Sequence, residues 1–153
     1  MLCSLLRNCI LSIRNIDQPG RQPVFKSISG STDNPGQSGY INYDQLVAAY
    51  EVFTVPANLI FVLEHVSAVV TRGSMPYPPG YMGDYGAVGY TLGAGNFFHT
   101  ISFTRREPEG ILQASHSMRL YIPSNARVIV KVPLIPDQSG GADTNVSGYY
   151  LNA

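Results

Sequence analysis

Three histidines are the residues of this chain best suited to chemistry, because an imidazole can bind a metal ion or exchange a proton near neutral pH. His65, His99 and His116 each lie in an apolar stretch that alternates like a β-strand. In regular strands each would share a face with apolar neighbours, as His65 does with Phe61 and Leu63. The chain therefore offers either a three-histidine metal site or three hydrogen-bonded histidines at a core or sheet edge.

The spacing of the histidines favours the second interpretation. Metal sites of the cupin kind take two histidines from one strand as H-x-H, and the sequence has no such pair. Glu64 alternates away from His65 unless a β-bulge intervenes. A carboxylate on an apolar face is unfavourable unless it is paired, and Arg119 or Arg127 could pair with it. We expect a structural ion pair there and predict no cofactor.

Nucleophilic catalysis has no support in the sequence. It contains no G-x-S-x-G elbow and no phosphate-binding loop of the G-x-x-x-x-G-K type. Both cysteines, Cys3 and Cys9, lie in the first ten residues, far along the chain from any histidine. They are either paired with each other or free thiols. We predict a protein that is not an enzyme.

The composition excludes partners that are recognised through charge. Charged residues make up 13% of the 153 residues, about half the usual share of roughly 25%. Ten basic and ten acidic side chains cancel, so no field of one sign attracts nucleic acid or anionic lipid. We expect a surface that contacts neighbouring molecules, no nucleic-acid partner and no membrane span.

The hydrophobic pattern predicts an all-β protein. Leu59–Thr71 follows a turn at Pro56–Asn58 and is long and rich in β-branched residues, which indicates a central strand buried on both faces or nearly so. No helical period is visible, and about eight strands are separated by turn signals. We predict a single antiparallel β-sandwich, of jelly-roll type. The predicted strands are Phe25–Ser29, Leu46–Thr54, Leu59–Thr71, Gly86–Ala94, Phe97–Thr104, Ile111–Ile122, Ala126–Leu134 and Thr144–Leu151.

The N-terminal segment is the first candidate for assembly. We assign residues 1–28 to an extended arm and residues 29–153 to the sandwich. An apolar arm can add a strand to the open sheet edge of a neighbouring copy, or to its own sheet. Met1–Ile13 also resembles the remnant of an export signal. The assembly residues we predict in the arm are Leu5, Leu6, Ile10, Leu11, Ile13 and Ile16.

The loop Arg72–Tyr85 is the second candidate, because it joins large side chains to stiffening prolines. Three interpretations remain open: the loop packs on its own domain, contacts another subunit, or stacks on sugar rings. The residues we predict to make such contacts are Met75, Tyr77, Tyr81, Met82 and Tyr85.

Four motifs occur in one order along the chain. They are R-N-I-D-Q-P-G-R-Q-P at Arg14–Pro23, V-P-A-N-L-I-F-V-L-E-H-V-S at Val55–Ser67, M-R-L-Y-I-P-S at Met118–Ser124 and S-G-Y-Y-L at Ser147–Leu151. With these motifs the chain resembles an uncharacterised family of bacterial β-sandwich proteins, many of them exported. The resemblance spans roughly residues 14 to 152. It implies the fold and an extracellular or cell-surface location, and it implies no activity.

The sequence therefore predicts a non-enzymatic structural protein that self-assembles, as a filament or another homo-oligomer, through its arm and Tyr-rich loop. A lectin-like sandwich that binds a glycan is the alternative. A cupin-like metal site built from the three histidines is the second alternative.

Overall fold

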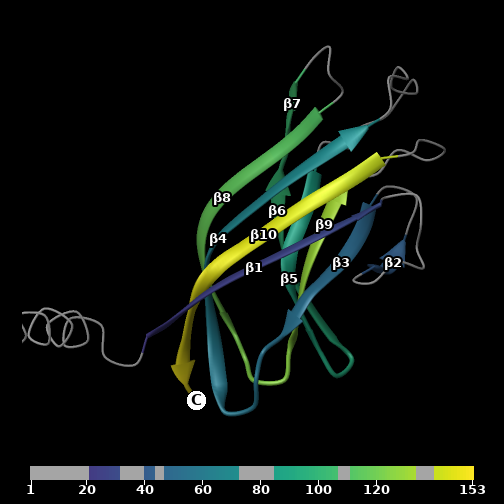
Figure 1. Ribbon diagram of the computed structural model, residues 1–153. Helices are drawn as coiled ribbons and strands as arrows, with labels where there is room; N and C mark the ends of the chain where they lie inside the picture. The colour runs from purple at the N-terminus through teal and green to yellow at the C-terminus, as the bar shows by residue number, and fades with distance from the viewer. Residues whose placement is uncertain (1–20, 32–39, 44–46, 73–84, 107–110, 134–139) are drawn as a thin grey trace, which may run out of the picture.

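The computed structural model of the chain describes residues 21–31, 40–43, 47–72, 85–106, 111–133 and 140–153, and every regular element in these ranges is a β-strand. The strands form two antiparallel sheets packed face to face (Figure 1). Sheet A has the order β1 (Gln22–Ser31), β10 (Gly140–Asn152), β4 (Leu59–Arg72), β8 (Ile111–Ile122), β7 (Thr104–Arg106). Sheet B has the order β2 (Tyr40–Tyr43), β3 (Val47–Thr54), β9 (Arg127–Pro133), β5 (Tyr85–Leu92), β6 (Gly95–Ser102).

The connectivity is that of a jelly roll. Without the short strands β2 and β7, sheet A reads β1-β10-β4-β8 and sheet B reads β3-β9-β5-β6. Strands from the two ends of the chain therefore lie side by side in both sheets, as two interlocked Greek keys require. The predicted antiparallel sandwich of jelly-roll type is confirmed. The described residues contain ten strands rather than eight because β2 and β7 extend the sheet edges.

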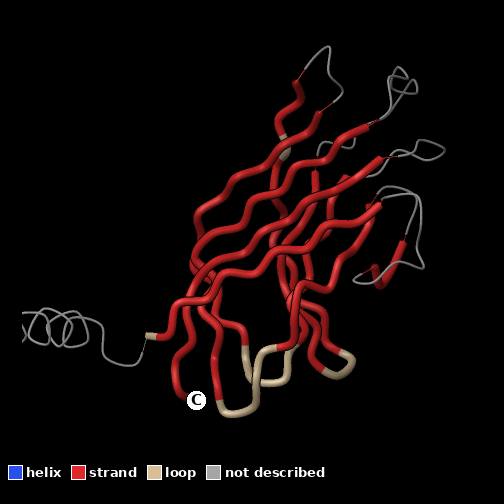
Figure 2. The backbone as a smooth tube through the Cα atoms, in the orientation of Figure 1, coloured by secondary structure: helices blue, strands red, loops and turns tan. Residues whose placement is uncertain are grey.

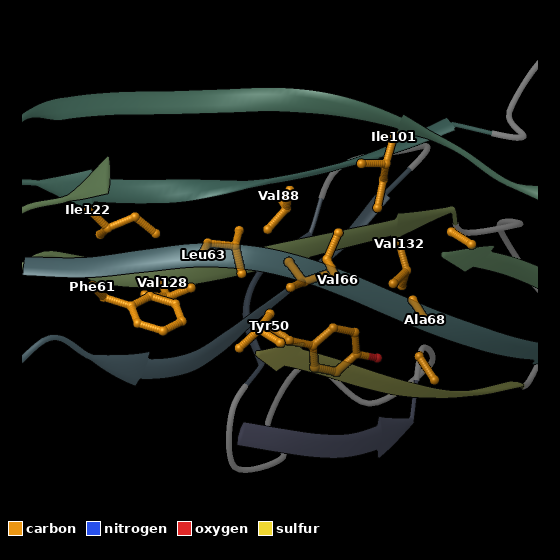
Figure 3. Close-up of a cluster of buried hydrophobic side chains, with 14 of the residues drawn as sticks. Tyr50, Phe61, Leu63, Val66, Ala68, Val88, Ile101, Ile122, Val128 and Val132 are labelled. Atoms are coloured by element: carbon orange, nitrogen blue, oxygen red, sulfur yellow. The ribbon is translucent and has the colours of Figure 1, made fainter. Parts of the chain in front are cut away.

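The core lies between the inner faces of the two sheets, where alternate residues of each strand meet (Figure 3). On β9, Val128, Val130 and Val132 are fully buried, as the alternation of that segment predicts. Phe61 and Leu63 face them from β4. The core of the described residues is built from apolar side chains, and both cysteines lie outside the described residues.

A β-bulge in β4 reverses the predicted orientation of part of that strand. The register shifts between Leu63 and His65 against both β8 and β10. Beyond the shift, Val66 and alternate residues after it face the core, and His65 turns to the outer face. The prediction that His65 lies on the apolar face is therefore wrong. The prediction that β4 is buried on both faces holds in part. On its outer face Val62 is fully buried, but Val69 is 39% exposed.

The boundary predicted for the arm also needs correction. β1 begins at Gln22, pairs with β10 without a break and contributes Val24 to the core. Residues 22–28 are therefore the edge strand of sheet A and belong to the sandwich. Residues 1–20, with all six predicted assembly side chains of the arm, lie outside the described residues.

Three tight turns close one end of the sandwich (Figure 2). Each contains a residue with left-handed backbone conformation: Asn58, Gly93 and Asn125. Two of these turns are bonded to each other, since Asn125 N donates to Val55 O at 2.9 Å. Short connections of this kind fix the relative position of the strands they join.

Candidate functional site

The three histidines lie on different strands and face different surroundings. His116 Nε2 donates a hydrogen bond to the backbone carbonyl of Ser102 at 2.9 Å, which links β8 of sheet A to β6 of sheet B. His65, on the outer face of sheet A, lies 3.4 Å from Ser115 Oγ. His99 is exposed on β6.

The histidines do not converge, and within the described ranges no group of three His, Cys, Asp or Glu residues could hold a metal ion. The bulge that turns His65 outward separates it from His116, which faces inward from the neighbouring strand. The cupin-like alternative therefore lacks its ligand set. The sequence left two interpretations open, a metal site or hydrogen-bonded histidines. His116 and His65 fit the second.

The ion pair predicted for Glu64 with Arg119 or Arg127 is wrong. Arg127 lies 3.6 Å from Glu51 on β3 and donates to Thr91 Oγ1 through Nε at 3.2 Å. Glu64 lies half-exposed at the bulge of β4, on the other sheet. Among the residues with described placement, Glu64 has no ion-pair partner, and its exposure removes the need for one.

Only one of the five contact residues predicted in the Tyr-rich loop can be placed. Tyr85 begins β5 and is 59% exposed. Met75, Tyr77, Tyr81 and Met82 lie outside the described residues, so contacts through this loop stay a prediction.

The sheet edges provide a candidate site that the structure describes fully. An unpaired edge strand presents free N–H and C=O groups that can template another strand, and proteins protect such edges with short strands, lysine, proline or bulges. β7 has three residues and β2 has four. β1 carries Pro23 and also Lys26, which lies on the same face as Val24.

The strands that β7 and β2 leave partly uncovered are protected in another way. β8 pairs with β7 only at Ile111–Gln113, and its remaining length carries a register shift and the exposed Arg119. β3 likewise has a register shift after Glu51, itself a charged residue. Both strands thus combine a register shift with a charged residue, which disfavours the addition of another strand.

β6 is the edge without any of these protections. Its eight residues, G-N-F-F-H-T-I-S, include no proline, lysine, arginine or acid. Its register with β5 is unbroken from Gly95 to Ser102. Within the described part of the chain, no strand pairs with its other side. An aromatic, uncharged, regular edge strand of this length is what strand addition requires.

The turn before β6 determines which backbone groups of this strand are free. Leu92 and Gly95 are direct partners across a two-residue turn, so they form a hydrogen-bonded pair. Bonding then alternates along the ladder, and Phe97, His99 and Ile101 bond to β5. Asn96, Phe98 and Thr100 consequently direct their N–H and C=O groups toward the open edge. The hydrogen bond from His116 to the Ser102 carbonyl agrees with this alternation. Ser102 is two residues after Thr100, so its carbonyl also points away from β5.

A hollow of about 430 Å³ lies beside this strand. Its walls come from β6 and from Leu120 of β8, on the facing sheet. Phe97 is 53% exposed and stacks on Tyr90 at 4.9 Å between ring centroids. On the other face of β6, Lys131 Nζ lies 4.1 Å from the centroid of the Phe98 ring. The site thus offers free backbone groups beside an open, largely apolar recess. The residues that line the hollow are Asn96, Phe97, Phe98, His99 and Leu120.

Sequence reasoning placed a strand at Phe97–Thr104 but did not identify it as an edge. The local signal was present, since the run from Gly95 to Ser102 lacks charge and proline. Its position in the sheet depends on the order of strands far apart in the chain, which the local pattern does not contain.

The comparisons with known proteins add no relative. No protein-family model and no curated protein sequence matches the chain. Within the described ranges there is also no helix long and apolar enough to cross a membrane. The resemblance to exported bacterial β-sandwich proteins therefore stays a prediction.

Proposed function

We propose that the protein is a non-enzymatic structural subunit that assembles with copies of itself by strand addition. The observation that carries the proposal is the β6 edge, which is regular and uncharged where the other sheet edges are protected. A jelly roll suits this role because its two sheets support each other and leave their edges available for contacts.

The energetics of an added strand support the proposal. Each new backbone hydrogen bond contributes roughly 0.5–1.5 kcal/mol net. Burial of exposed apolar surface adds to this, and Phe97 and Leu92 are 53% and 41% exposed beside the edge. These gains offset part of the roughly 4–15 kcal/mol that association costs in rotational and translational freedom, so further contacts must contribute to a stable assembly.

The arm and the Tyr-rich loop enter the proposal as further contacts. The apolar pattern of residues 1–16 suits a segment that joins a neighbouring subunit, and exposed Tyr85 marks the base of the loop at 72–85. An extracellular or cell-surface location follows from the resemblance to exported β-sandwich proteins.

Sedimentation velocity and negative-stain electron microscopy of the full chain test the proposal. The matched variant lacks residues 1–20 and begins at Arg21, because removal of residues 22–28 would delete β1 and its core residue Val24. We expect rings, shells or filaments from the full chain, and smaller or fewer assemblies after truncation. A full chain that stays monomeric at high concentration contradicts the proposal.

Glycan binding is the second candidate, supported by the exposure of Tyr85 and by a fold that lectins share. A screen against immobilised neutral glycans, with Tyr85→Ala as the comparison, tests it. Binding that the substitution abolishes would support this function. The absence of binding at millimolar sugar would remove it.

A further inference from the structure

We propose that the strand added to β6 is the β6 strand of a second copy, antiparallel across a two-fold axis at Phe98. This inference rests on the proposed function and names the partner of the same site. The two sheets B would then join into one continuous sheet through an isologous contact.

The spacing of the free backbone groups fits this arrangement. Asn96, Phe98 and Thr100 direct their N–H and C=O groups outward at every second position. With the axis at Phe98, each Asn96 lies opposite Thr100 of the second copy, and the two Phe98 residues lie opposite each other. These residues form hydrogen-bonded pairs, and together they exchange about six backbone bonds.

The side chains match in the same register. Asn96 meets Thr100 on the outer face of the sheet, which pairs two polar side chains beside the Phe98 contact. On the inner face Phe97 meets His99 of the second copy, so an aromatic ring faces an imidazole. The hollow of about 430 Å³ lies beside these inner side chains, because Phe97 and His99 line it together with Leu120. Phe97, now 53% exposed, would be covered there.

The charge distribution permits the contact. β6 has no lysine, arginine or acid, so no like charges lie opposite each other across the axis. A cation lies beside this strand, since Lys131 Nζ is 4.1 Å from the centroid of the Phe98 ring. Its backbone belongs to β9, two strands from the edge. The positive charge lies on Nζ rather than on this backbone, and each ammonium group is stabilised by a cation–π contact with its own Phe98 ring.

Disulfide trapping tests the register without altering Phe98. In a full chain with Cys3→Ser and Cys9→Ser, one variant carries Asn96→Cys and another carries Thr100→Cys. Both positions are exposed, and far-UV circular dichroism verifies that each variant is folded. The two proteins are oxidised separately and as a mixture, then separated on a non-reducing gel. Ser115→Cys, exposed on sheet A, is the control for collisional cross-linking.

We expect a covalent dimer from the mixture and little from either variant alone. Residues opposite each other have Cα atoms about 5.5 Å apart, within the disulfide range of about 4.4–6.8 Å. The same residue in the two copies lies about 14 Å away along the ladder. The mixture should therefore exceed each single variant, and the Ser115→Cys control, at least about tenfold in dimer yield after the same time.

Two results would overturn the inference. Equal dimer yield from one variant alone would exclude this register. The second result combines two observations: no mixed dimer forms, and Thr100→Pro still abolishes assembly. Another strand, such as the N-terminal segment of a neighbour, would then be the one that adds to β6. In that case the proposed function stands and only the two-fold contact fails. A wild-type chain that does not assemble overturns both.

Discussion

Proline substitutions at two adjacent positions of β6 should differ sharply in their effect on the folded monomer. The ladder phase directs the N–H of His99 to the carbonyl of Val88 and the N–H of Thr100 to the open edge. Proline removes the N–H in both cases. His99→Pro should therefore destabilise the fold, whereas Thr100→Pro should leave its free energy of unfolding nearly unchanged.

The magnitude follows from burial. Val88 is fully buried, and a buried carbonyl that loses its donor costs about 1–3 kcal/mol. Thr100 is exposed and its N–H has no partner in the ladder, so the change there should stay within about 0.5 kcal/mol. The residue before a proline prefers extended backbone, which His99 already has as part of β6.

Urea denaturation at a concentration where the chain is monomeric measures both effects. With an m-value of about 2 kcal/mol/M, His99→Pro should lower the midpoint by roughly 0.5–1.5 M and Thr100→Pro by less than about 0.3 M. Thr100→Ser, which retains the N–H, is the matched control and should behave as wild type. If Thr100→Pro destabilises the monomer as much as His99→Pro, the assignment of the free edge is wrong.

Three further predictions concern the sandwich itself. Gly148→Ala should lower the free energy of unfolding by about 1–3 kcal/mol, because a β-carbon there meets the backbone oxygen of Val62. Gly141→Ala is the control in the same strand. Its β-carbon would lie 3.4 Å from a side-chain oxygen, so the free energy of unfolding should change little. Phe61→Ala should cost about 3–5 kcal/mol, since the ring is fully buried and packs against two other rings; a midpoint within 0.3 M of wild type in urea would contradict this packing (about 0.6 kcal/mol). Desolvation by burial raises the pKa of Tyr150 above its ordinary value of 10.0. The unfolded chain therefore ionises first, so this contribution to stability is complete below pH 10 and is lost as the pH rises through the folded-state pKa. Tyr150→Phe should flatten that alkaline decline in thermal melts, and an unchanged decline would assign it to other groups.

Local pattern was sufficient to predict most strands and the fold. β8 has the bounds Ile111–Ile122 that its sequence indicates, and β9 buries Val128, Val130 and Val132 as its alternation requires. Both segments face the core on one side and keep alternating between core and outer face, so the period of two in their side chains is visible in the sequence.

The errors have a common physical origin, because they depend on partners distant in the chain. The bulge after Leu63 is a mismatch between β4 and its two neighbours, and it reversed the side on which His65 was expected. The strand predicted at Phe25–Ser29 is shorter than β1, Gln22–Ser31, because an edge strand buries little and its full length is defined by pairing with β10. The candidate site at β6 likewise depends on strand order, which places the second strand of a hairpin at an open edge of sheet B.

Sedimentation velocity over a wide concentration range, on wild type, Thr100→Ser and Thr100→Pro, is the measurement to make first. Assembly through β6 predicts concentration-dependent association of wild type and Thr100→Ser, and a monomer for Thr100→Pro. Equal association of all three proteins, or a wild-type chain that stays monomeric throughout, would contradict assembly at this edge.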